Sequence, residues 1–82
     1  MSLVRIALAN VREPLSADES VQLATSTVAE AGRRGALVVC FPEAFVPGYR
    51  WPGRTMAPPD AAFLERAWAA VGDAAREAGI TV

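Results

Sequence analysis

The apolar run 36–41, which ends at Pro42 and is followed at once by Glu43, is the sequence feature that most constrains the fold. A short apolar run with two adjacent valines is typical of a strand that is covered on both faces in a parallel sheet. Proline has no amide hydrogen to give to a strand ladder, so we expect the strand to end at Pro42. Because ligands of open α/β sheets bind beyond the carboxyl ends of strands, Glu43 is the first candidate functional residue.

Two interpretations of Glu43 remain open on this local pattern. Partial desolvation beside the apolar run would make its carboxylate a stronger proton acceptor, as a catalytic base requires. Alternatively, Glu43 caps the turn that follows or pairs with an arginine. The pattern favours neither role over the other.

The chain before the apolar run predicts a strand and then a helix. Residues 3–11 alternate loosely between apolar and polar side chains, which indicates a first strand. Ser16 followed by Glu19 is a capping box and predicts a helix start. We expect this helix to continue to about Arg34 and to stop at Gly35 in the left-handed conformation. The order strand, helix, strand predicts a right-handed crossover between parallel strands.

A second helix is predicted from Asp60, which reads as its amino cap, to about Ala78, with Gly79 as its stop. Its apolar residues recur at helical spacing, and we expect this face to pack against the sheet. The face contains Phe63, Leu64, Ala67, Trp68, Val71, Ala74, Ala75 and Ala78. Residues 80–82 then begin a third strand that is cut off within it, so we expect the chain to be truncated there.

Composition excludes several classes of function. Histidine is absent, which removes the Ser-His and Cys-His arrangements. The arginines are scattered and the formal net charge is -1, so neither nucleic acid nor an anionic membrane is an expected partner. No run approaches the ~18 apolar residues of a membrane span, and residues 1–20 lack the cationic segment and long apolar core that would lead us to expect secretion. A reducing cytoplasm is the expected location, because a single cysteine forms no internal disulfide.

Three stretches of the sequence together resemble the start of a carbon–nitrogen hydrolase, of the nitrilase and amidase superfamily. They are Val-Arg-Ile-Ala-Leu-Ala-Asn at 4–10, Phe-Pro-Glu at 41–43 and Phe-Val-Pro-Gly-Tyr at 45–49. The last two, at this spacing and after a strand and helix, are the specific part of the resemblance. The resemblance implies an α/β fold, in which residues 1–82 form the βαβαβ amino-terminal part of an αββα sandwich.

The resemblance also implies a chemistry. Family members break a non-peptide carbon–nitrogen bond of a nitrile, amide or carbamoyl compound with a Glu-Lys-Cys set, and Glu43 matches the glutamate. The eight basic residues are all arginine, so the lysine is missing. Cys40 lies three residues before Glu43, where the family does not place its nucleophile. We interpret Cys40 as a buried, inert structural thiol.

These omissions predict an amino-terminal fragment that is inactive alone. The resemblance implies that the full-length enzyme needs no metal or organic cofactor, acts on a small molecule and forms a homo-oligomer. The alternative is a non-catalytic fragment or interaction module derived from such a hydrolase, which associates through its open sheet edge.

Residues 44–60 are rich in proline and predict an ordered, irregular loop. By resemblance this loop shapes the substrate site, with Tyr49 and Trp51 as candidate walls and Arg50 or Arg54 as candidate binders of a carboxylate. The alternative is that the aromatic side chains pin the loop to the scaffold and that the arginines are solvated.

Overall fold

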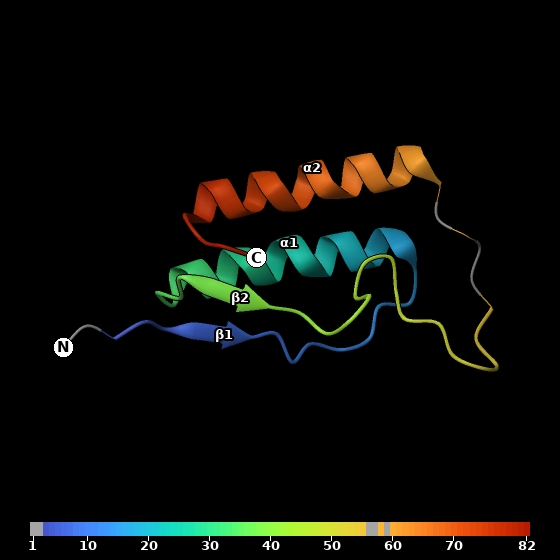
Figure 1. The fold of residues 1–82 in the computed structure, drawn as a ribbon, viewed down its shortest axis with the longest axis horizontal. Coiled ribbons are helices and arrows are strands. Elements are labelled where there is room, and N and C mark those ends of the chain that lie inside the picture. The colour runs from blue at the N-terminus through green and yellow to red at the C-terminus, as the bar shows by residue number, and fades with distance from the viewer. Residues whose placement is uncertain (1–2, 56–57, 59) are drawn as a thin grey trace.

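A computed structural model describes residues 3–55, 58 and 60–82 of the chain. The elements follow in the order β1 (Ile6–Leu8), α1 (Ala17–Arg33), β2 (Val38–Cys40) and α2 (Ala61–Ala78), as Figure 1 shows. This is the predicted alternation of strands and helices. Positions 56, 57 and 59 of the predicted irregular loop lie outside the described residues.

The two strands are parallel, with Ala7 opposite Val39, as the strand, helix, strand order predicts. A third segment pairs with the other side of β2 through a parallel bridge between Val38 and Thr81. There the Val39 amide donates to the Thr81 carbonyl at 2.8 Å, and the Thr81 amide donates to the Leu37 carbonyl at 2.9 Å. The predicted third strand is therefore represented by a single bridge at Thr81. Strand β2 lies between β1 and this segment.

Local signals place both ends of α1 where the sequence predicts them. The Ser16 hydroxyl accepts from the Glu19 amide at 3.0 Å, which satisfies one orphan donor of the first turn. The Glu19 carboxylate accepts from the Leu15 amide at 2.8 Å, one residue before the amide of a standard capping box. At the other end the helix stops at Arg33, and Gly35 has a φ of 80°.

The bounds of α2 also match the prediction, since Asp60 accepts from the Phe63 amide at 2.6 Å and Gly79 has a φ of 66°. The packing of the apolar face of α2 differs from the prediction that it lies against the sheet. Helix α2 lies against α1, and it contacts the core beside the sheet through Ala74, Ala75 and Ala78, while Ala67 is buried nearer the start of the helix. Trp68, which we expected to pack against the sheet, is 77% exposed. Small residues let the two helices approach closely at one end of α2, and this contact leaves the larger side chains of its first half outside the core.

The hydrophobic core lies on one face of the sheet. Val28 of α1 and Val39 of β2 are fully buried at its centre. Alternate side chains of a strand point to opposite faces, so the neighbours of Val39 point away from the helices. On that second face Leu8 is 79% exposed and Cys40 is exposed. The expectations of a strand covered on both faces and of a buried Cys40 are therefore wrong for the described chain, because both helices pack on the same side.

Within the described ranges, neither helix is long and apolar enough to cross a membrane.

Candidate active site

Glu43 lies just beyond the carboxyl end of β2, at the start of a turn over residues 43–47. The turn is closed by two backbone hydrogen bonds. The Phe45 amide donates to the Pro42 carbonyl at 3.2 Å, and the Gly48 amide donates to the Ala44 carbonyl at 3.1 Å. The strand ends before Pro42 as predicted, and this end brings Glu43 to the edge of the sheet where parallel strands present functional groups.

A buried aromatic side chain anchors the turn. Phe45 is 7% exposed, and its ring lies 5.2 Å from the ring of Phe41, tilted at 41°. Between Glu43 and this anchor, Ala44 has a φ of 53°, in the left-handed region that a residue with a Cβ seldom adopts. The anchored turn therefore holds Glu43 on a short, constrained segment rather than on a long free loop.

The carboxylate of Glu43 is exposed, so the partial desolvation that the apolar run predicts is absent. Pro42 and Ala44, on either side of Glu43, are also exposed, so the start of the turn lies at the surface. Both chain neighbours of Glu43, Pro42 and Ala44, line an apolar groove of about 510 Å³. Glu43 itself is not among the lining residues, although it lies between two of them in the chain.

The groove lies between the turn after β2 and one face of α2, and Ala24 of α1 also lines it. Leu64, Trp68 and Val71 of α2 form one side of it, and Ile80 lies near its floor beside the core. Several of the side chains that we expected to pack against the sheet, these three among them, thus line this groove instead. Concave, mostly apolar surfaces with a few polar groups nearby are typical of small-molecule sites.

The loop residues that the resemblance assigns to substrate binding lie elsewhere. Tyr49, Arg50 and Trp51 are all exposed and line neither this groove nor the one between the helices. Their contact with a substrate stays a prediction. Trp51 has a partner within its own loop, because the Arg54 guanidinium lies 4.7 Å from the centre of its ring.

Arg54, the other candidate binder of a carboxylate, is engaged by the protein itself. Its guanidinium donates to Glu13 Oε1 at 2.5 Å and to the Pro14 carbonyl at 2.7 Å, and its side chain is only 14% exposed. Sequence reasoning missed the contact with Glu13. The two residues are 41 positions apart, and neither belongs to a periodic pattern or a motif that would have paired them.

A second ion pair stabilises the connection between β1 and α1. Arg12 contacts Glu19 at 2.6 Å, while the Leu15 amide donates to the same carboxylate oxygen. The hydrogen bond from Arg12, followed by that from Leu15, lowers the pKa of Glu19 to about 2. Glu19 therefore stays charged at neutral pH and serves the helix start rather than proton transfer.

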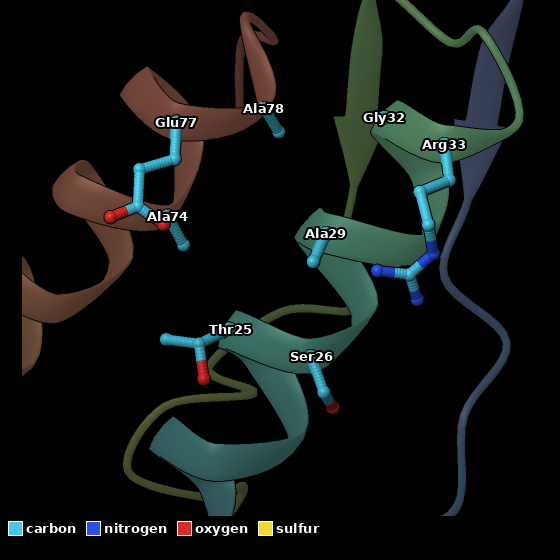
Figure 2. Close-up of a pocket in the computed structure, with 8 residues that line it drawn as sticks. All are labelled: Thr25, Ser26, Ala29, Gly32, Arg33, Ala74, Glu77 and Ala78. Atoms are coloured by element: carbon cyan, nitrogen blue, oxygen red, sulfur yellow. The ribbon is translucent and has the colours of Figure 1, made fainter.

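A second groove of about 610 Å³ lies between α1 and α2, and Figure 2 shows the residues that line it. It contains small side chains such as Ala29 and Ala74, with Arg33 and Glu77 as its charged groups. Arg33 is already paired with Glu30 at 2.5 Å. This groove follows from the close approach of the helices and contains none of the residues that the sequence singled out for chemistry.

A family model of carbon–nitrogen hydrolases matches residues 5–82. The match covers almost the whole chain, including the strand end that carries Glu43. The chain belongs to the carbon–nitrogen hydrolase family. No curated protein and no solved structure gives a significant match. The parallel pair of strands and the two helices are compatible with part of the fold of such a hydrolase.

This carbon–nitrogen hydrolase chain contains few groups able to do the chemistry of the family. It has a glutamate at the strand end, no lysine, and Cys40 as its single cysteine. Cys40 lies opposite Leu8 on the open face of the sheet, so it is exposed but does not line either groove. Among the described residues, no cluster of three acidic or cysteine side chains has the arrangement of a metal site.

Proposed function

We propose that this hydrolase breaks a non-peptide carbon–nitrogen bond of a nitrile, amide or carbamoyl compound, with Glu43 as its general base. One observation carries the proposal: Glu43 follows β2 at the ligand edge of a parallel sheet, inside the region that matches the family. The apolar groove beside it suits a small organic molecule rather than a charged polymer.

The proposed reaction proceeds in two steps through a thioester. Glu43 accepts the proton of a cysteine thiol while the sulfur attacks the substrate carbon, and the nitrogen leaves as ammonia or an amine after it receives that proton. Glu43 then accepts a proton from water, which attacks the thioester and releases the acid and the thiol. A lysine ammonium stabilises the negative charge that develops on the substrate during both steps. For a nitrile, a thioimidate forms first, and it takes up water and releases its nitrogen as ammonia to give the thioester.

The lysine and the reactive thiol come from polypeptide outside these 82 residues in this proposal. Two observations support that arrangement. The chain has no lysine, and its single cysteine lies on the open face of the sheet. That face also exposes Ile6 and Leu8, by 58% and 79%, although both are strand residues with large apolar side chains. We propose that a second sheet covers it in a complete αββα sandwich, since apolar sheet faces are normally buried.

The test uses the protein that contains this sequence, purified from its natural host. It is incubated with a matched amide and nitrile of one small carboxylic acid, and ammonia release is followed together with the intact mass. We expect ammonia release, and an acyl adduct on a cysteine other than Cys40 after rapid acid quenching. Hydrolysis without any adduct, or an adduct on Cys40, would contradict the proposed chemistry. The isolated 82-residue chain should release no ammonia from either substrate.

The exposed apolar face also favours a second candidate function, a non-catalytic interaction module. In that case the natural protein would have the 8.7 kDa mass of this sequence and would associate through Ile6, Leu8 and their neighbours. Intact mass and sedimentation of the natural protein separate the two candidates. A natural protein that is several times heavier than 8.7 kDa and that hydrolyses the substrates supports the enzyme over the interaction module.

A further inference from the structure

Arg54 joins two loops that are far apart in the sequence. From the loop after β2, its guanidinium reaches the connection between β1 and α1, where it donates to Glu13 Oε1 at 2.5 Å and to the Pro14 carbonyl at 2.7 Å. Its side chain is 14% exposed, so the ion pair is partly shielded from solvent on the arginine side. Pro14, one of its acceptors, is itself buried. The arginine side of the contact is thus packed into the structure, while the Glu13 side chain is 50% exposed.

The same guanidinium also organises its own loop. It donates to the Tyr49 carbonyl at 3.2 Å and lies 4.7 Å from the centre of the Trp51 ring. Directly before Tyr49, the Gly48 amide donates to the Ala44 carbonyl at 3.1 Å, and Ala44 is the residue after Glu43. A short series of hydrogen bonds and covalent links therefore connects Arg54 to the turn that carries Glu43.

We propose that Arg54 is a positioning residue of this hydrolase, which fixes the Glu43 turn by clamping residues 48–54 to the connection between β1 and α1. The inference rests on the proposed function for its catalytic meaning, because Glu43 is the base there. It replaces the idea that Arg54 binds a substrate carboxylate, since its donors are directed at Glu13, Pro14 and Tyr49.

Arginine suits this place better than lysine for a geometric reason. Its planar fork presents donors in several fixed directions at once, and its flat face stacks on an aromatic ring. In this structure one nitrogen reaches Glu13 and Tyr49, the other terminal nitrogen reaches Pro14, and the carbon at the centre of the fork lies over Trp51. A lysine has one terminal ammonium group and no planar fork, so it could make only some of these hydrogen bonds and could not stack on the ring.

The test measures amide hydrogen exchange at Gly48 and Phe45 by NMR in the natural protein that contains this chain. We expect Arg54→Met to speed exchange at both amides by about tenfold, and Arg54→Lys to give an intermediate rate. The matched control is Arg66→Met, at an exposed position on α2, which should leave both rates unchanged. Rates at Gly48 and Phe45 that stay within about twofold of the unsubstituted chain in Arg54→Met would overturn the clamp.

A variant that unfolds is recognised by its α1 amides. If Val28 loses protection together with Gly48, the Arg54→Met variant is unfolded, and the proposal is then tested with Glu13→Gln. This substitution removes the charge of one partner and leaves the other contacts of Arg54 in place. We expect Glu13→Gln to speed exchange at Gly48 by about threefold with Val28 unaffected. An unchanged Gly48 rate in that variant would also overturn the clamp.

Activity of the natural hydrolase tests the positioning role itself. Arg54→Met should lower kcat by about tenfold with KM nearly unchanged, and Arg54→Lys should restore part of the loss. A fast-exchanging Arg54→Met variant with unchanged kcat would overturn the positioning role alone. The exchange measurement needs no turnover, so failure of the proposed function, seen as full activity in Glu43→Gln, is distinguished from failure of the clamp.

Discussion

Gly32 of α1 and Ala78 of α2 meet so closely that a Cβ added at Gly32 would lie 2.8 Å from the Ala78 Cβ and 3.3 Å from its carbonyl oxygen (Figure 2). Neither atom can move by a side-chain rotation, so the helices would have to separate. We expect Gly32→Ala to lower the free energy of unfolding by about 1–3 kcal/mol, measured by urea denaturation.

Gly72 of α2 provides the matched control for that substitution. A Cβ at this position meets nothing within 4 Å. Alanine has the higher helix propensity, so Gly72→Ala should raise the free energy of unfolding by about 0.5–1 kcal/mol. Equal effects of the two substitutions would contradict the close contact between the helices.

Ala44, beside the candidate base, adopts a φ of 53°. Glycine adopts this conformation without the steric penalty of a Cβ. Ala44→Gly should therefore stabilise the chain by about 1 kcal/mol in thermal or urea unfolding. Ala62→Gly, in the first turn of α2, should instead destabilise it by about 0.5–1 kcal/mol, and a similar loss at Ala44 would argue against the left-handed turn.

Glu19 makes the stability of the chain sensitive to acid. Its pKa is lowered from an ordinary value of 4.5 to about 2, first by the hydrogen bond from Arg12 and then by that from Leu15. A carboxyl whose pKa is lowered by folding stabilises the folded state above its unfolded pKa, and this contribution is lost as the pH falls from 4.5 toward 2. An NMR titration should place the midpoint near pH 2 in the unsubstituted chain and higher in Arg12→Met. An identical midpoint in both proteins would rule out the role of Arg12.

Trp68 should contribute little to stability although it is one of the largest apolar residues of α2. It is 77% exposed, so Trp68→Ser should change the free energy of unfolding by less than about 0.5 kcal/mol. Val28 is fully buried, and Val28→Ala should lower that free energy by at least about 1.5 kcal/mol. A large loss in Trp68→Ser would restore the core role that the helical pattern predicts.

The elements of this fold can be predicted from the sequence because their signals are local. Ser16 and Asp60 mark helix starts, while Gly35 and Gly79 mark helix ends, and all four act within one turn of the backbone. The face that each element buries depends on distant partners. Periodicity marks the apolar face of α2, but it does not show that the alanines of this face become buried while its larger side chain Trp68 stays exposed.

In the candidate site, too, the local features can be predicted from the sequence and the contacts between distant residues cannot. The strand ending at Pro42 places Glu43 beyond β2, and the exposure of its carboxylate could not be predicted because it depends on what surrounds the turn. The clamp between Arg54 and Glu13 is equally invisible in the sequence, since it joins two irregular segments. Cys40 illustrates the limit of an apolar run, which does not say whether one face or both faces of its strand are covered.

The rate of ammonia release by the natural hydrolase, compared between the unsubstituted protein and Glu43→Gln, tests the central claim most directly. The amide keeps the size of the side chain but accepts no proton. If Glu43 is the general base, kcat should fall by about 10²–10⁴-fold. Glu65→Gln, at an exposed position on α2, should retain full activity. A Glu43→Gln enzyme that works within about twofold of the unsubstituted rate would contradict the account.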